Sequence, residues 1–383
     1  MDFELNEEQK ILKKAAAEFG AGEFEEGKEY DRKEKFPWDV IKKAAKQGFI
    51  GVLLDEKFGG AGYTVTEKGL IIKEFAKIDP GIAQAIWSAD FGAYIVQKHG
   101  GEDLKKKYLP KVTSGETVMG TAISEPDVGS DLASIRTRAV KKDGKYVIDG
   151  NKMFVTNGDV ADFIIVYCRT DPDVKRGHKG LSLFIINTDD EGYQSNKLEG
   201  KLGIRASDTA EVSLSGVEVD EGKMIGEEGK GVYYVLDFLT KVNRICTAFF
   251  AVGIAEGAFE KSLDYAKERE QFGKPISEFQ MIKAKLAEMK TKIDAAKLLT
   301  HRAAEESART EGRLANLNPS IAKWYAGEVA VDVVDEALEI HGGYGYMEDY
   351  DIERFYRDAK IAEIYEGTKE IQKLMIADDI LQR

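Results

Sequence analysis

The first hundred residues alternate between hydrophobic and polar positions with the 3.6-residue period of an α-helix. Near the start, Leu5, Ile11, Leu12 and Phe19 fall close to one face, and this spacing predicts an amphipathic helix. The same periodicity continues to about Leu109. We therefore expect the chain to begin with a helical domain.

Within this region, residues 81–96 carry apolar side chains at intervals of three and four, which predicts a buried helix. Asp90 is the only charged residue in the segment. An isolated buried carboxylate is unfavourable unless it is paired or protonated. Asp90 is therefore a candidate functional residue.

The pattern changes after Pro110, where short apolar runs are bounded by Gly, Asn and Asp. Val212 and Leu214 alternate with polar neighbours, as in a half-buried strand. Residues 164–166 instead form a continuous apolar run, which is typical of a strand covered on both faces. These patterns predict a β domain in the middle of the chain.

Helical periodicity returns at Gly231, and in the segment 282–300 the apolar positions step by four and three residues, as in a helix of a bundle. The chain has 38 Gly but only 7 Pro, which favours long helices separated by glycine-containing turns. The expected fold is mainly α with a central β domain. Its expected domains, in the order helical, β and helical, are residues 1–119, 120–226 and 227–383.

Composition narrows the functional classes. Asp and Glu number 68 against 55 Lys and Arg, and the formal charge of -13 disfavours nucleic acid or an anionic membrane surface as a partner. Cys168 and Cys246 cannot build a disulfide framework or a four-cysteine zinc site, and they fit a reducing cytoplasm. The sequence shows neither a signal-peptide core nor a membrane-spanning apolar run. We expect a cytoplasmic protein without integral membrane association.

Several catalytic chemistries are also disfavoured. None of the 4 histidines has a Glu three positions before it, as a carboxylate-bridged metal site in a helical bundle requires, so we expect no metal. The G-x-S-x-G nucleophile elbow is absent. Residues 226–232 and 342–346 lack the spacing of a phosphate loop or a dinucleotide fingerprint, so any nucleotide cofactor must be bound by other means.

Three separated stretches resemble the acyl-CoA dehydrogenase family of flavoproteins. They are AISEPDVGSD at 122–131, REQFGKPISEFQ at 269–280, and the segment from EIHGGYGY to YEGTKEIQ at 339–372. Together with weaker matches they extend the resemblance over nearly the whole chain. The resemblance implies an N-terminal helical domain, a middle β-barrel or sandwich domain and a C-terminal four-helix bundle, in agreement with the hydrophobic pattern.

The resemblance further implies non-covalent FAD and oxidation of an acyl-CoA thioester to its 2,3-enoyl form. Glu366 in IYEGT matches the base that removes the α proton while hydride passes to flavin N5. A thioester α proton is weakly acidic, so such a site must raise the basicity of the carboxylate by desolvation and stabilise the enolate oxygen with fixed donors. The implied donors are the backbone N–H of Glu366 and a ribityl hydroxyl of FAD. The implied electron acceptor is an electron-transferring flavoprotein.

The resemblance also assigns binding residues. Those near the flavin are Thr121, Ile123, Ser124, Gly129, Ser130, Phe154, Thr156 and Thr368. Those for the adenosine part of FAD on a neighbouring subunit are Arg269, Phe272, Gln280, Glu339, Gly342 and Gly343, which implies a homo-oligomer, expected to be a tetramer. Those for the substrate are Ser130, Arg244, Tyr365 and Gly367. For Arg269 an ion pair with the nearby Glu268 or Glu270 is the alternative.

Asp90 admits three interpretations. It is a paired structural Asp or one at a pocket mouth; a second acid/base or polar contact for an unusual acyl tail, as the resemblance implies for alicyclic substrates; or part of a dicarboxylate site, which would want an Arg that residues 81–96 lack. We expect a short, branched or alicyclic acyl group, with a cyclohexanecarboxyl type as the specific candidate. The functional alternatives are an O2-using oxidase or monooxygenase of the same fold and a non-catalytic acyl-CoA-binding protein.

Overall fold

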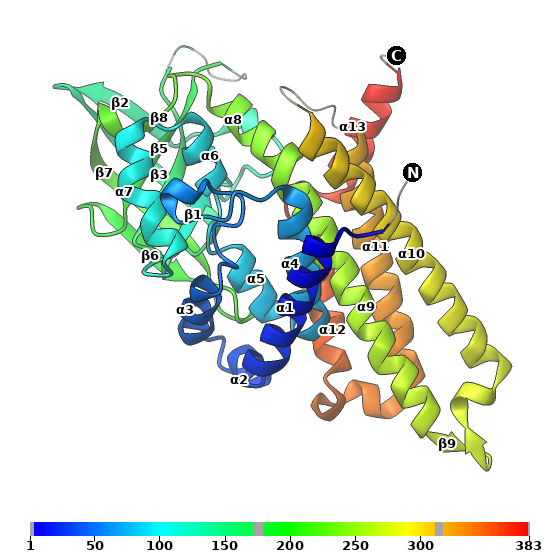
Figure 1. Ribbon diagram of the computed structural model, residues 1–383. Coiled ribbons are helices and arrows are strands. Elements are labelled where there is room, and N and C mark those ends of the chain that lie inside the picture. The colour runs from blue at the N-terminus through cyan, green and yellow to red at the C-terminus, as the bar shows by residue number, and fades with distance from the viewer. Residues whose placement is uncertain (1–3, 172, 174–178, 311–316, 382–383) are drawn as a thin grey trace.

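The computed structural model describes residues 4–171, 173, 179–310 and 317–381, so that His178 lies outside the described residues. Helices come first along the chain, then a sheet, then helices again, as predicted (Figure 1). The N-terminal helices are α1 (Glu7–Glu23), α2 (Gly27–Arg32), α3 (Trp38–Lys46), α4 (Val65–Ile78), α5 (Pro80–Trp87), α6 (Ala93–His99) and α7 (Glu102–Thr113).

Helix α1 begins at a capping box in which the side chains of Asn6 and Gln9 each accept a backbone N–H of the other residue. A cap of this kind stabilises a helix by about 1 kcal/mol. The predicted apolar face is confirmed at three positions, Leu5, Leu12 and Phe19, which pack against the core. For Ile11 the prediction is wrong, since this side chain is 69% exposed. Each residue turns the helix by about 100°, so Ile11 points away from the core although the adjacent Leu12 packs against it.

The segment 81–96 is buried nearly throughout, but it is not the single helix that its spacing predicts. Helix α5 ends at Trp87 and α6 begins at Ala93. Between them Gly92 has a φ of 106°, and the backbone of Asp90 pairs with Met119 at the start of the strand β1 (Met119–Ala122). Backbone pairing with this distant strand replaces a helical turn, and local hydrophobic spacing carries no sign of it.

The middle of the described chain forms one eight-stranded mixed sheet. Strands β6, β7, β3, β2, β4, β5 and β8 follow one another in space, and β1 pairs in parallel with β4. Strand β4 is buried at every residue and β7 alternates between buried and accessible positions, which confirms both predicted patterns. The strands after β1 are β2 (Arg138–Lys142), β3 (Lys145–Thr156), β4 (Phe163–Arg169), β5 (Leu181–Asn187), β6 (Tyr193–Lys197), β7 (Thr209–Asp220) and β8 (Met224–Ile225).

The C-terminal part is a bundle in which α9, α10 and α11 pack against one another (Figure 1). The predicted face of α10 is confirmed, since Met289, Ile293, Ala296 and Thr300 are buried. A π-helical turn, Leu239–Asn243, separates α8 from α9. The elements of this part are α8 (Gly231–Phe238), α9 (Arg244–Glu268), β9 (Glu270–Gln271), β10 (Lys274–Pro275), α10 (Gln280–Arg309), α11 (Leu317–His341), α12 (Ile352–Ala359) and α13 (Lys369–Leu381).

The N-terminal helices and the bundle share one core. Helix α4 packs on α9 so closely that a Cβ at Gly69 would lie 2.1 Å from the ring of Phe249, and only glycine allows this approach. Asp79 caps α5 by accepting the N–H of Ile82 at 2.8 Å and also pairs with the buried Arg354 of α12. Helices α4 and α5 of the N-terminal part therefore pack on and pair with helices of the C-terminal bundle.

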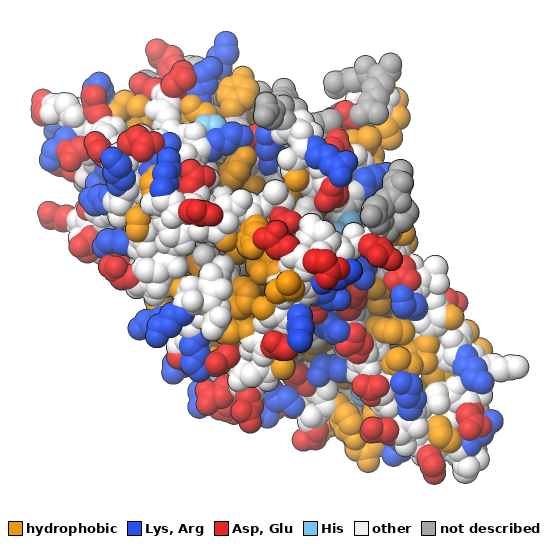
Figure 2. Space-filling model, in the orientation of Figure 1, with side chains coloured by type: hydrophobic (Ala, Val, Ile, Leu, Met, Phe, Trp, Pro, Cys, Tyr) orange, Lys and Arg blue, Asp and Glu red, His pale blue; other side chains and the backbone are white. Residues whose placement is uncertain are grey.

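The surface of the molecule carries mixed charges, whereas a long helix in its interior is apolar. Figure 2 shows acidic and basic side chains interspersed over the visible face, in keeping with an excess of acidic residues that is not gathered in one patch there. The helical run Gly231–Glu268 is long and apolar enough to cross a membrane, but its apolar window is wholly buried inside the molecule. This is the composition of a helix at the centre of a bundle.

Candidate functional site

Glu366 lies in the loop between α12 and α13, where the backbone is left-handed. Its φ is 57° and that of Gly367 is 90°, and a non-glycine residue in this region persists only when its surroundings hold it. Lys323 of α11 donates from Nζ to the carbonyl oxygen of Gly367 at 2.7 Å. Gln372 of α13 donates to the same oxygen at 3.0 Å and to that of Glu366 at 3.3 Å. Two helices therefore fix the backbone of the loop.

The carboxylate of Glu366 is held by a third helical element. Asn243, the last residue of the π-helical turn, donates from Nδ2 to Glu366 Oε2 at 3.0 Å. Although part of the Glu366 side chain is accessible, the carboxylate lies deep among protein atoms, and this burial raises its pKa. The Asn243 hydrogen bond and the charges of Lys323 and Arg244 oppose the rise, but burial dominates. The result is a carboxylate more basic than an ordinary surface Glu.

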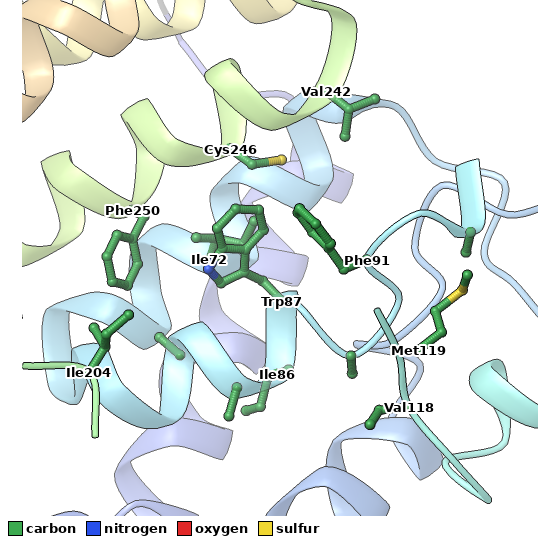
Figure 3. Close-up of a cluster of buried hydrophobic side chains, with 14 of the residues drawn as sticks. Ile72, Ile86, Trp87, Phe91, Val118, Met119, Ile204, Val242, Cys246 and Phe250 are labelled. Carbon is green, nitrogen blue, oxygen red and sulfur yellow. The ribbon is translucent and has the colours of Figure 1, made fainter. Parts of the chain in front are cut away.

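Asn243 also lines a cavity of about 10 Å³, which has room for a single water molecule. Trp87 and Phe91 point from the α5–α6 region toward the helix that carries Val242 and Cys246 (Figure 3). Most of the side chains that line the cavity are apolar, and the polar ones include Lys68, Asp90 and Asn243. Its lining residues are Leu53, Leu54, Lys68, Trp87, Asp90, Phe91, Tyr94, Phe238, Val242 and Asn243.

Asp90 lines this cavity as one half of a buried ion pair. Its Oδ1 lies 2.5 Å from Lys68 Nζ of α4, and both side chains are 7% exposed. Its Oδ2 accepts the backbone N–H of Gly51 at 3.1 Å. Lys68, Asp90 and Glu366 all act electrostatically on the buried thiol of Cys246, whose pKa burial raises to about 12. The structure thus brings Asp90 and Glu366 into the same region.

The loop that carries Glu366 also contacts α5. Tyr365 donates its hydroxyl to Gln84 Oε1 at 3.0 Å, and Trp87 donates its indole N–H to the same oxygen at 2.9 Å. Trp87, which lines the cavity, and Tyr365, which precedes Glu366, therefore share Gln84 Oε1 as their acceptor. This arrangement couples the position of the loop to the wall of the cavity.

The residues expected around a flavin ring meet at the ends of β1 and β3. Thr121 belongs to β1, Ile123 and Ser124 follow it, and the Ser124 carbonyl oxygen accepts the N–H of Met153 in β3 at 2.9 Å. A register shift in β3 between Lys152 and Val155 marks a bulge. Bulges re-aim side chains next to functional sites.

At this bulge Phe154 has a φ of 58° and is 68% exposed, whereas Thr156 is half-buried. An exposed aromatic ring on strained backbone, with the hydroxyl residue Thr156 two positions further along the strand, suits a flat aromatic ligand that would cover it. Gly129 leaves open space where a side chain would stand, and it lies with Ser130 on an exposed loop. The residues present therefore fit an isoalloxazine ring with its phosphate tail.

A buried ion pair supports this loop. Lys152, which is fully buried, donates from Nζ to the carbonyl oxygen of Ile123 at 3.0 Å and to Glu125 Oε1 at 3.1 Å. Glu125 in turn accepts the backbone N–H groups of Arg136 and Thr137, each at 2.8 Å. The segment after β1 is thus anchored by charge-assisted hydrogen bonds.

The residues expected to bind adenosine form a second group, around the β9–β10 hairpin, at the end of the bundle away from the sheet (Figure 1). One chain does not bring the two groups together. Arg269 lies over the ring of Tyr344 at 5.4 Å, instead of in the alternative ion pair with Glu268 or Glu270. Phe272 is 93% exposed, and Gln280, Glu339, Gly342 and Gly343 are also exposed.

Three of the residues expected to contact the substrate, Arg244, Tyr365 and Gly367, lie near Glu366 or beside it in the chain. Arg244 is buried at the start of α9, and burial lowers its pKa to about 10. Thr368, which is expected near the flavin, lies at the start of α13 and not at β1 or β3; its hydroxyl accepts the N–H of Ile371 at 3.4 Å. Tyr365 and Gly367 flank the base, and Ser130 lies on the exposed loop after β1.

Sequence reasoning missed the residues that hold Glu366 and Asp90, which are Asn243, Lys323, Gln372 and Lys68. A signal existed for the two lysines, because each occupies the apolar face of its helix. Lys68 is followed at spacings of three and four by Ile71 and Ile72, and Lys323 by Ala326 and Gly327. Asn243 and Gln372 carry no such signal.

Three family models match successive parts of the chain. They are described as "Acyl-CoA dehydrogenase, N-terminal domain" (residues 6–116), "Acyl-CoA dehydrogenase, middle domain" (120–217) and "Acyl-CoA dehydrogenase, C-terminal domain" (229–381). The chain is 40% identical to an acyl-CoA dehydrogenase of Bacillus subtilis (98% of this chain, 99% of the relative). It is 36% identical to cyclohex-1-ene-1-carbonyl-CoA dehydrogenase of Syntrophus aciditrophicus (99% and 91%). It is 34% identical to caffeyl-CoA reductase-Etf complex subunit CarC of Acetobacterium woodii (99% and 100%).

Among solved structures, butyryl-CoA dehydrogenase of Megasphaera elsdenii superposes with a TM-score of 0.94 at 37% identity, and the match covers 100% of both chains. Sequence and structure therefore agree over the full length. The chain belongs to the acyl-CoA dehydrogenase family, FAD-dependent oxidoreductases that act on CH–CH groups.

Proposed function

We propose that this protein oxidises a short, branched or alicyclic acyl-CoA thioester to the enoyl-CoA, with Glu366 as the base that removes the α proton. The observation that carries this proposal is the environment of Glu366. Burial raises the pKa of its carboxylate, and Asn243, which donates a hydrogen bond to this carboxylate, also lines a small cavity with several apolar side chains. This is the combination that abstraction of a weakly acidic carbon-bound proton requires.

The chain also offers a donor for the oxygen that becomes negative as the proton leaves. Within the described residues, the backbone N–H of Glu366 donates to no protein acceptor. The left-handed backbone of Glu366 and the two hydrogen bonds to Gly367 O fix the direction of this N–H. A preorganised donor of this kind stabilises a developing oxyanion without reorganisation. FAD, when bound, supplies the two-electron acceptor, and Phe154, Thr156 and Ser124 are the residues that would hold its ring.

The direct test replaces Glu366 by Gln, which keeps the size of the side chain. We expect the Glu366→Gln holoenzyme to retain its flavin spectrum and acyl-CoA binding but to lose at least about 10³-fold in the rate of flavin bleaching, within the range that general-base catalysis contributes. Unchanged turnover would refute the assignment. Rapid reoxidation of the reduced enzyme by air, with product turnover, would instead favour an oxidase of the same fold.

The residues near Glu366 also bear on the size and shape of the acyl group. The cavity lined by Trp87 and Phe91 holds no more than a water molecule, so an acyl group must displace the side chains around it, and this favours short or compact acyl groups over long chains. The relative named cyclohex-1-ene-1-carbonyl-CoA dehydrogenase supports a cyclohexanecarboxyl-type substrate, for which Asp90 on the cavity wall would be a second acid/base. The ion pair of Asp90 with Lys68 instead favours a structural role for this carboxylate. Flavin bleaching across straight, branched and cyclic acyl-CoAs tests it, and a clear preference for butyryl-CoA would exclude this role of Asp90.

We also propose a cytoplasmic homotetramer that passes electrons to an electron-transferring flavoprotein. The separation of the two groups of FAD residues in one chain supports an oligomer in which a second copy completes the site. The name of the Acetobacterium woodii relative, a subunit of an Etf complex, supports the partner. Light scattering of the holoenzyme and the rate of electron transfer to purified electron-transferring flavoprotein test these two points separately.

A further inference from the structure

We propose that Asn243 and Lys323 are positioning residues for Glu366: Asn243 restrains its carboxylate, and Lys323 restrains the backbone that carries it. This inference rests on the proposed role of Glu366 as the base. The two residues are 80 positions apart by number, on the π-helical turn and on α11, and both donate hydrogen bonds to the Glu366 loop.

Asn243 acts on the carboxylate from the π-helical turn. It is 2% exposed, so water does not compete for its amide, and it donates to Glu366 Oε2 at 3.0 Å. A π-helical turn holds one more residue per hydrogen-bonded ring than an α-helix and is frequent at functional sites. Asn243 also lines the small cavity that Trp87 and Asp90 line, so the same side chain contacts both the base and this cavity.

Lys323 acts on the backbone from the other side. Its side chain is fully buried on α11, at a point where the helix approaches the segment before the loop so closely that a Cβ at Gly327 would lie 2.9 Å from the carbonyl oxygen of Ala362. A buried ammonium group is unfavourable unless it has a partner. Its partners here are the Gly367 carbonyl oxygen and the nearby negative charge of Glu366.

The groups around Glu366 and Lys323 determine in which direction the loss of Asn243 or Lys323 changes the pKa of Glu366. Burial raises the pKa of Glu366, and the Asn243 hydrogen bond, the Lys323 charge and the Arg244 charge lower it. Burial lowers the pKa of Lys323 to about 8, with opposing contributions from Glu366, Glu363 and Glu370 and a further lowering from Arg244. Lys323 is therefore mostly charged at neutral pH. Removing either Asn243 or Lys323 must make Glu366 harder to ionise.

The test measures deprotonation without dehydrogenation. The holoenzyme, with its flavin kept reduced, is incubated with butyryl-CoA in D2O, and exchange of the α protons is followed by NMR as a function of pH. Exchange in the wild type falls as the pH drops through the pKa of Glu366. In Asn243→Leu and Lys323→Met we expect this fall to move to higher pH by about one unit, the size of a lost charge-assisted contact. Asn243→Asp should move it further, since a second carboxylate opposes ionisation.

Matched variants separate charge from packing. Gln372→Leu removes another donor to the same carbonyl oxygen without changing any charge, so it should lower the exchange rate and leave the pH of the fall in place. Lys323→Arg should restore the wild-type pH dependence. Lys323→Gln serves if the methionine variant does not fold, and it should give the same shift because it also lacks the charge.

Two failures are distinguishable. If Glu366→Gln still exchanges the α protons, the proposed base is wrong, whatever the other variants do. The positioning role is overturned if Glu366→Gln abolishes exchange but the other variants keep the wild-type pH dependence. In that outcome the exchange rate of Asn243→Leu, and of the folded Lys323 variants that lack the charge, decreases at the same pH as that of the wild type, and Glu366 remains the base.

Discussion

The buried ion pair between Lys68 and Asp90 allows the sharpest prediction about stability and function together. The ion pair is tested with three variants, Asp90→Leu, Lys68→Met and the double replacement, each of which replaces a charged side chain by an apolar one of similar shape. If the ion pair is structural, the double variant keeps the fold and the activity. If Asp90 acts on the substrate, the double variant keeps the fold and loses activity toward that substrate.

The magnitude follows from the geometry of the pair. At 2.5 Å and an effective dielectric constant of about 20, the attraction is roughly 7 kcal/mol. Desolvation of two charges that are each only 7% exposed opposes it by several kcal/mol per ion. The two contributions roughly cancel, so the double variant should lie within about 1–2 kcal/mol of the wild type. Either single variant leaves one buried charge without its partner and should lose about 3–5 kcal/mol.

The assay is urea unfolding of all four proteins, followed by tryptophan fluorescence, because Trp87 lines the same cavity and is 4% exposed. A double-mutant cycle gives the coupling free energy. The same four proteins are then tested for bleaching of the flavin by butyryl-CoA and by cyclohexanecarboxyl-CoA. A structural pair predicts equal rates for the wild type and the double variant with both substrates.

Two results would refute this reasoning. A loss of less than about 1 kcal/mol in Asp90→Leu would show that Lys68 does not depend on Asp90 for its burial. A selective loss of cyclohexanecarboxyl-CoA oxidation in the stable double variant would show that the ion pair serves catalysis. In that case the second acid/base role of Asp90 would replace the structural one.

Three further predictions concern other parts of the molecule. Gly367→Ala places a Cβ at a φ of 90° and 2.5 Å from Gln372 Nε2, so it should lower stability by about 1 kcal/mol or more and slow the base-dependent step, as thermal unfolding and pre-steady-state bleaching will show. Burial raises the pKa of Glu256, but the charge of Lys73, 2.7 Å away, helps to lower it to about 2. Because the folded-state pKa lies below the unfolded one, this stability is present above about pH 4.5 and is lost as the pH falls toward 2; Glu256→Gln should remove about 3 kcal/mol at pH 7, measured by urea unfolding across that range. Phe272→Asp should lower the mass of the holoenzyme in light scattering, because a ring that is 93% exposed at the end of the bundle is expected to be covered by a second copy; an unchanged mass would contradict this.

Local pattern predicted the elements whose burial is regular. The continuous apolar run of β4, the alternation of β7 and the stepped apolar positions of α10 all have the burial that their spacing indicates. In such elements the side-chain period follows directly from the backbone geometry, so the sequence carries the information within one short window.

The pattern was misleading where a distant segment intervened. The predicted helix over residues 81–96 breaks around Asp90, since its backbone pairs with Met119 of β1. The sequence singled out Asp90 as an unusual charge, but it contained no indication that Lys68 would be the partner. That pairing depends on how α4 packs beside the break.

Hydrophobic periodicity is enough to predict the order of the helical and β regions, and the motifs identify the family and Glu366 as the candidate base. The properties of that carboxylate depend on contacts that form only when the chain folds. Asn243 is 123 positions from Glu366 along the chain, and Lys323 is 44 positions from Gly367. The physical reason is that desolvation and hydrogen bonding depend on which atoms surround a group in space, and these atoms come from helices that are remote in sequence.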